Sequence, residues 1–134
     1  MPALRTLALT ALCAMAATNI SHAADTTAAR QLAHWSAQAG SPGHADKGKV
    51  FFTTRHGGEW SCASCHGTPP TTQGKHASTG KSIAPLAPAF NPTAFTDTAK
   101  IDKWFRRNCN DVLSRECTAI EKADVLAYLN ALKP

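Results

Sequence analysis

The sequence predicts an all-α fold built around a single core. Apolar residues recur at helical spacing in several segments, and residues that cap helices stand at the ends of those segments. No segment alternates polar and apolar residues over a length that would indicate a strand. The chain has 134 residues and no internal repeat. One domain is therefore expected.

The first residues are typical of a secretory signal peptide. Arg5 provides a positive start, and the apolar stretch from Leu7 to Ala17 is too short to cross a bilayer. Ser21-His22-Ala23 fits the small-x-small cleavage pattern. We therefore expect a signal peptide over residues 1–23, a mature domain over residues 24–134 and a periplasmic location.

Two helices are expected before the centre of the chain. Thr26 or Thr27 can cap a first helix that runs towards Ala39, and Gly40 is suited to end it. The pattern predicts a second helix from about Asp46 to Thr54.

Cys62-Ala63-Ser64-Cys65-His66 is the most informative segment of the sequence. Two thiols and an imidazole at this spacing predict a c-type haem attachment site. Cys62 and Cys65 can bond to the two haem vinyl groups as thioethers, and His66 can bind the iron from the proximal side. Export agrees with this reading, because c-type haem is attached outside the cytoplasm in bacteria. One covalent haem c is the expected cofactor.

Other uses of a Cys-x-x-Cys pair have less support. A redox disulfide expects a strand–helix–strand setting, which the sequence lacks here. A zinc site would need further ligands at paired spacing, and Cys109 and Cys117 do not form a second such pair. These two cysteines are an even pair in an oxidising compartment, which predicts a disulfide. Two buried free thiols are the alternative.

The segment from Gly67 to Pro92 is rich in Gly, Pro, Thr and Ser, which is typical of loops. So long a loop is unusual in a small domain, and a rigid haem that supplies part of the core is a sufficient explanation. A histidine that binds iron usually donates its other ring N–H to an acceptor. For His66 we expect the carbonyl of Pro85 to accept this hydrogen bond. Its competitors are Pro69, Pro70 and Pro88.

Helical spacing returns near Thr98, where Ile101, Trp104 and Phe105 form one apolar stripe. The last helix begins at a capping box, with a hydroxyl at Thr118 and a carboxylate at Glu121. Its apolar face consists of Val125, Leu126, Tyr128, Leu129 and Leu132.

Gly48 and Phe52 lie four residues apart and therefore share a face of the second helix. Glycine lets another helix approach its backbone closely. Together with Tyr128 and Leu129, this pattern resembles class I cytochromes c, whose N- and C-terminal helices cross through a glycine–aromatic contact. The resemblance implies a class I cytochrome c fold wrapped around one covalent haem, in which methionine usually binds the distal face of the iron.

Methionine cannot be the distal ligand of the expected mature chain, because Met1 and Met15 both lie in the signal peptide. The alternatives are a histidine, a lysine, a neutral side chain or no ligand. The side chains considered are His34, His44, His56, His76, Lys81 and Lys100.

The segment around Asn108 has a more specific resemblance, to the SHP (sphaeroides haem protein) cytochromes. In that family, an asparagine just before the first cysteine of a short disulfide loop binds the ferric iron. Asn108 occupies this position, and Cys109 and Cys117 match the loop cysteines. The similarity covers most of the chain from Asp46 onward. It includes Gly80 to Pro88, Lys103 to Phe105 and Arg115 to Thr118.

An asparagine ligand has chemical consequences of its own. The amide carbonyl is a neutral, hard oxygen donor, which suits Fe(III) better than Fe(II). The ferric iron should therefore be high-spin or close to it. Reduction should weaken the bond and open the face to a small gas. The alternative for Asn108 is a capping or turn residue near a helix end.

The SHP resemblance implies that the reduced protein binds O₂ and NO and receives electrons from a di-haem or membrane cytochrome. Whether it also converts these gases as an enzyme stays open. The rival function is a plain electron shuttle whose distal ligand never leaves. A gas sensor would need an output domain, and the sequence resembles none. The oligomeric state is also open, with a monomer as the expectation.

The net charge is +5. Several cations lie close together in sequence: Lys100, Lys103, Arg106, Arg107 and Arg115. Nucleic acid is not an expected partner, because the sequence contains no motif for it. The cations predict a docking surface for an acidic redox partner, a screen for the haem propionates, or an ordinary solvated helix face.

Overall fold

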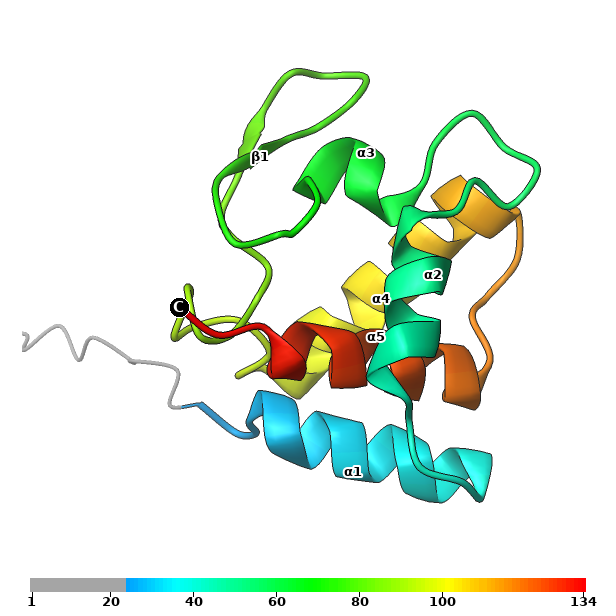
Figure 1. Ribbon diagram of the computed structural model, residues 1–134, viewed down its shortest axis with the longest axis vertical. Helices are drawn as coiled ribbons and strands as arrows, with labels where there is room; N and C mark the ends of the chain where they lie inside the picture. The colour runs from blue at the N-terminus through cyan, green and yellow to red at the C-terminus, as the bar shows by residue number, and fades with distance from the viewer. Residues whose placement is uncertain (1–23) are drawn as a thin grey trace, which may run out of the picture.

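The computed structural model describes residues 24–134 and confirms the all-α fold (Figure 1). The predicted signal peptide lies outside the described residues. Within residues 24–134, α5 packs against both α2 and α1, while α3 and a small hairpin lie on the other side of the molecule from α1. No helix of this region has the length and apolarity needed to cross a membrane. The elements are α1 (Ala28–Ala39), α2 (Ala45–Thr53), α3 (Cys62–His66), β1 (Gly74–Lys75), β2 (Ser82–Ile83), α4 (Thr98–Leu113) and α5 (Ala119–Ala131).

The first two helices begin and end close to the predicted positions. The hydroxyl of Thr27 caps α1 by accepting a hydrogen bond from the backbone N–H of Arg30 at 3.2 Å. Gly40 ends the helix in the left-handed conformation, with φ of 67°. Helix α2 begins and ends one residue before the predicted bounds.

The crossing of α2 and α5 forms the centre of the core. Gly48 is buried there, and a Cβ atom at this position would overlap the backbone carbonyl of Asp124 and approach the Cβ of Tyr128. One turn later, the ring of Phe52 lies 5.6 Å from that of Tyr128. The predicted glycine–aromatic contact between the two helices is therefore confirmed.

Helix α5 begins at the predicted capping box. Thr118 and Glu121 exchange hydrogen bonds between side chain and backbone in both directions. Asp124 is a buried carboxylate on this helix, and it accepts a hydrogen bond of 2.6 Å from the backbone N–H of His44. Because His44 precedes the first residue of α2, this bond ties the start of α2 to α5.

Helix α4 changes the interpretation of two sequence features. Asp97 caps it by accepting from the N–H of Lys100 at 2.9 Å. Ile101 is buried on its inner face, but Trp104, predicted to share that apolar stripe, is 43% exposed. Asn108 lies five residues before the last residue of α4, so it does not cap the helix or form a turn.

The predicted loop from Gly67 to Pro92 contains a hairpin that the sequence analysis did not predict. Strands β1 and β2 pair antiparallel, with Gly74 opposite Ile83. Each strand has only two residues, too few for polar–apolar alternation to show. Gly74 lets the hairpin approach α3, because a Cβ atom there would overlap the carbonyl oxygen of Cys65.

Candidate haem site

Helix α3 consists of the haem motif itself. Ser61 caps it, and its backbone N–H donates to the hydroxyl of Ser64 at 3.0 Å. Cys62 and Cys65 are both unpaired and partly buried in the structure. Residues three apart on a helix lie on the same side, so both thiols can reach one planar group.

His66 stands at the end of α3, and its ring centroid lies 6.2 Å from that of Phe52. Burial lowers the pKa of its imidazole below the ordinary value, which favours the neutral form that binds metals. Its Nδ1 atom is buried and has no hydrogen-bond partner within residues 24–134. These features fit an iron ligand that binds through Nε2.

The environment of Cys62 differs from that of a reactive thiol in a redox motif. Burial raises the pKa of the Cys62 thiol to about 11, so it stays protonated at neutral pH, unlike the reactive thiolate of a redox motif. No group of three or more metal-ligating His, Cys, Asp or Glu side chains occurs within the described chain.

The hairpin also reaches Cys65, whose sulfur accepts the backbone N–H of Ala77 at 3.3 Å. Nothing in the local sequence indicated this contact.

The expected bond between the Pro85 carbonyl and His66 is not formed. The Pro85 carbonyl accepts instead from the side-chain amide of Asn91 at 2.9 Å, which holds the turn that follows it. The carbonyls of the competing prolines accept backbone N–H groups near them in sequence or across the loop. These bonds are Thr71 to Pro69, Leu86 and Ala87 to Pro70, and Asn91 to Pro88.

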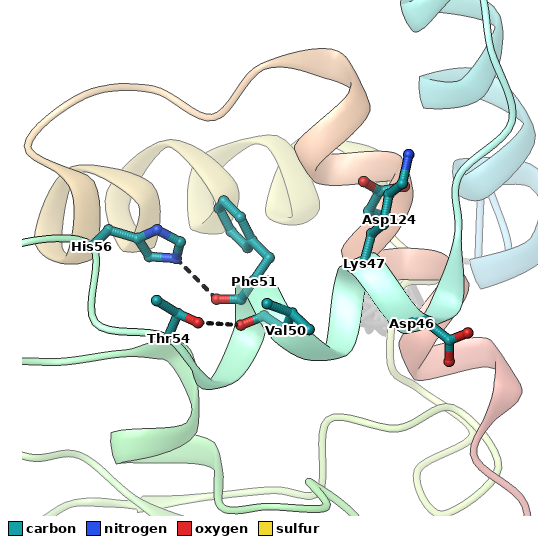
Figure 2. Close-up of a pocket in the computed structure, with 7 residues that line it drawn as sticks. All are labelled: Asp46, Lys47, Val50, Phe51, Thr54, His56 and Asp124. Carbon is teal, nitrogen blue, oxygen red and sulfur yellow. Dashed lines mark hydrogen bonds between the residues drawn. The ribbon is translucent and has the colours of Figure 1, made fainter.

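A hollow of about 510 Å³ lies beside α2, but it contains neither the haem motif nor Pro85 or Asn108 (Figure 2). Val50 lines it and is 64% exposed. His56 also lines it, and its Nε2 atom is 2.9 Å from the carbonyl oxygen of Phe51, as Figure 2 shows. The other lining residues are Asp46, Lys47, Phe51, Thr54 and Asp124.

Asn108 is half-buried on α4, and its side-chain amide makes no hydrogen bond with another group of residues 24–134. The next residue, Cys109, is buried and forms a disulfide with Cys117, whose Cα lies 5.5 Å away. The amide is therefore available to an external partner, while the disulfide holds the backbone beside it.

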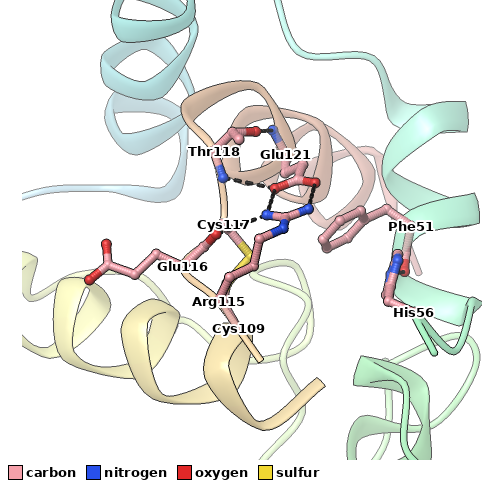
Figure 3. Close-up of a disulfide and its surroundings, with 8 residues drawn as sticks. All are labelled: Phe51, His56, Cys109, Arg115, Glu116, Cys117, Thr118 and Glu121. Atoms are coloured by element: carbon pink, nitrogen blue, oxygen red, sulfur yellow. Dashed lines mark hydrogen bonds and ion pairs between the residues drawn. A yellow bond between two sulfur atoms is a disulfide. The ribbon is translucent and has the colours of Figure 1, made fainter. Parts of the chain in front are cut away.

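The disulfide loop is also held by an ion pair (Figure 3). The guanidinium of Arg115 donates two hydrogen bonds, of 2.7 and 2.8 Å, to the carboxylate of Glu121. The hydrogen bond from Arg115, together with those from Thr118, lowers the pKa of Glu121 to about 2. The pair therefore stays charged at any ordinary pH. The sequence analysis missed it, because no short motif joins an arginine in a loop to the capping residue of the next helix.

Most of the other candidate iron ligands have different roles or stay exposed. The Nδ1 atom of His76 accepts the backbone N–H of Thr79 at 3.2 Å, in the turn of the hairpin. His56 contacts Phe51, with 4.4 Å between the ring centroids. The remaining candidates are exposed: His34, His44, Lys81 and Lys100.

Removing the disulfide is expected to destabilise the fold. With Cys109 and Cys117 both replaced by alanine, the free energy of unfolding should fall by about 2.5 kcal/mol, as the chain-entropy model gives for so short a loop. Ligand binding rates should change as well, because Asn108 adjoins the bridge. Denaturant titration and stopped-flow mixing measure the two effects. Two alkylatable thiols in the unreduced protein would contradict the bridge.

The relatives found by comparison with known proteins are c-type cytochromes. Residues 38–129 match a family described as a domain of unknown function, DUF1924. Cytochrome c-type protein SHP of Cereibacter sphaeroides is 48% identical over 113 residues, which cover 81% of this chain and 87% of that protein. Cytochrome c″ of Methylophilus methylotrophus is 46% identical over 86 residues, covering 61% of this chain and 60% of that protein.

Solved structures agree in fold. The structure of oxidized SHP, described as an oxygen-binding cytochrome c, has a TM-score of 0.75 and 47% identity, and covers 81% of this chain and 99% of that chain. The crystal structure of oxidized cytochrome c″ from M. methylotrophus has a TM-score of 0.67 and 37% identity. The match covers 80% of this chain and 95% of that chain. A solution structure of M. methylotrophus cytochrome c″, which concerns haem-ligand detachment, has a TM-score of 0.67 and 36% identity. The match covers 80% of this chain and 94% of that chain.

Proposed function

The chain belongs to the SHP family of c-type cytochromes and carries one covalently attached haem c, and on this premise we propose that it binds O₂ and NO at the ferrous haem. The observation that carries the proposal is the similarity to SHP, an oxygen-binding cytochrome c, over almost the whole of that chain. When bound, the haem supplies an iron that changes oxidation state and takes diatomic ligands.

In this proposal, Cys62 and Cys65 hold the haem through thioether bonds and His66 is the proximal ligand. Two unpaired thiols on one side of α3 support the first assignment. The buried, unpartnered Nδ1 of His66 supports the second, because an N–H at that position could donate to a water or a carbonyl beside the iron ligand.

Asn108 is the proposed distal ligand of the ferric iron, and it leaves when the iron is reduced. Three observations support this role: the lack of methionine in residues 24–134, the unpartnered amide, and the disulfide beside it. Its hard carbonyl oxygen binds Fe(III) better than Fe(II). Once released, the amide can rotate and donate an N–H to the bound gas.

We place the protein in the periplasm and propose that a di-haem or membrane cytochrome supplies its electrons. Export is supported by the signal pattern of residues 1–23 and by the disulfide. Docking of an acidic donor is supported by four exposed cations on α4: Lys100, Lys103, Arg106 and Arg107. Association with such a donor should weaken as salt is raised.

The test is stopped-flow mixing of the reduced protein with O₂ and, separately, with NO. We expect a ferrous spectrum without a distal Asn108 bond and rapid formation of a gas complex with each. A ferrous haem that keeps six ligands and binds neither gas would instead support the rival function, a plain electron shuttle with a permanent distal ligand.

A further inference from the structure

Trp104 is an aromatic side chain that the packing of the protein does not explain. Within residues 24–134, it and Val50 are the large hydrophobic residues that stay exposed, Trp104 by 43%. Its aromatic-ring contacts in this region come from its own helix. Lys103 Nζ lies 5.7 Å and Arg107 Cζ 5.6 Å from the ring centroid.

The phase of α4 places Trp104 beside the proposed iron ligand. Trp104 and Asn108 are four residues apart, so they lie on one stripe of the helix. Helical side chains lean towards the helix N-terminus, so the Asn108 side chain lies over the turn that carries Trp104. An indole and an amide therefore share one edge of α4.

A neighbouring face of α4, about 100° further round the helix, is covered by protein. Phe105 packs edge-on against Trp35 of α1, with 6.4 Å between the ring centroids. Cys109 is buried against its disulfide partner Cys117. Asn108 lies between this covered face and the exposed Trp104, so the half-buried amide and the indole stand together at the border of the packed surface.

We propose that the indole of Trp104 forms one wall of the gas-binding face and limits the size of the ligand that reaches the iron. This inference rests on the proposed role of Asn108, because that residue identifies which edge of α4 faces the haem. Lys103 and Arg107 hold the ring in place through cation–π contacts. When Asn108 leaves, Trp104 admits a diatomic molecule and excludes larger ones.

The experiment compares a small and a bulky ligand of the ferric protein, azide and imidazole. Both must displace Asn108, so the ratio of their dissociation constants cancels that common cost. In Trp104→Ala, the affinity for imidazole relative to azide should rise by about tenfold or more, since steric discrimination in apolar pockets commonly reaches this size. Trp104→Phe should show a smaller rise. Val50→Ala, which shortens an exposed apolar side chain on α2, is the control and should leave the ratio unchanged.

An unchanged or falling ratio in Trp104→Ala overturns the proposal. If that variant also took up electrons more slowly from a donor cytochrome, Trp104 would be a docking residue instead. Trp104→Leu provides the same comparison if the alanine variant fails to retain haem. The proposed function is tested separately. If Asn108→Ala leaves the ferric spectrum unchanged while Trp104→Ala still shifts the ratio, the ligand assignment fails and the wall stands.

Discussion

Replacing Asn108 with alanine is expected to change the ferric absorption spectrum and to strengthen azide binding by more than about tenfold. If Asn108 binds the ferric iron as proposed, an anion can bind only to the fraction of molecules in which Asn108 has left the iron. If the bound form holds more than about 90% of the population, its removal raises the apparent affinity by more than about tenfold. The variant should bind water or hydroxide, or leave the face open. Azide titration followed by absorbance measures both effects.

Asn110→Ala is the matched control for this experiment. Asn110 lies on the same helix, two residues further along, and is exposed. Its replacement should leave the ferric spectrum and the azide affinity as they are. If Asn108→Ala behaves like this control, Asn108 is not the ligand. His76 or a lysine then becomes the better candidate, and His76 would first have to give up its hydrogen bond to the backbone of Thr79.

Local chemistry explains the parts of the fold that could be predicted from the sequence. Caps act within one turn, so Thr27, Gly40 and Thr118 place helix ends without knowledge of the rest of the chain. The shared face of Gly48 and Phe52 follows from helical spacing, whereas their crossing with α5 was implied by the resemblance to class I cytochromes c. The haem motif is likewise contained in five consecutive residues.

The parts that could not be predicted depend on contacts between distant segments. The Pro85 carbonyl looked available in sequence, but the turn that follows it brings Asn91 into hydrogen-bonding range. The hairpin against α3 depends on Gly74 approaching Cys65, and two-residue strands have no readable period. Helical spacing predicted that Trp104 is part of the apolar stripe of α4, but its side chain is exposed. Spacing alone does not show how wide the covered face of a helix is.

The second large effect is expected from Gly48→Ala, at the crossing of α2 and α5. Alanine favours an exposed helix by about 1 kcal/mol over glycine, so propensity alone predicts a more stable protein. Here, the added Cβ would overlap the backbone carbonyl of Asp124, and neither helix backbone can yield by rotating a side chain. Overpacking of this kind typically costs about 1–3 kcal/mol, and a clash with backbone belongs at the upper end. The cost of the steric overlap should therefore exceed the gain in helix propensity, and the free energy of unfolding should fall by about 2 kcal/mol or more.

Gly58→Ala is the control for this prediction, because a Cβ there would meet its nearest neighbour, the Val112 carbonyl, at an ordinary 3.5 Å. In denaturant titrations of the haem-loaded proteins, Gly48→Ala should unfold at a clearly lower denaturant concentration than Gly58→Ala. The effect should also reach the haem, because the same crossing positions Phe52, whose ring centroid lies 6.2 Å from that of His66. A changed ferric spectrum in Gly48→Ala, together with the lower midpoint, would show that the crossing holds His66, the proposed proximal ligand, in place. Equal midpoints for the two variants would mean that the helices can separate at little cost, and Gly48 would then not be required for their close approach.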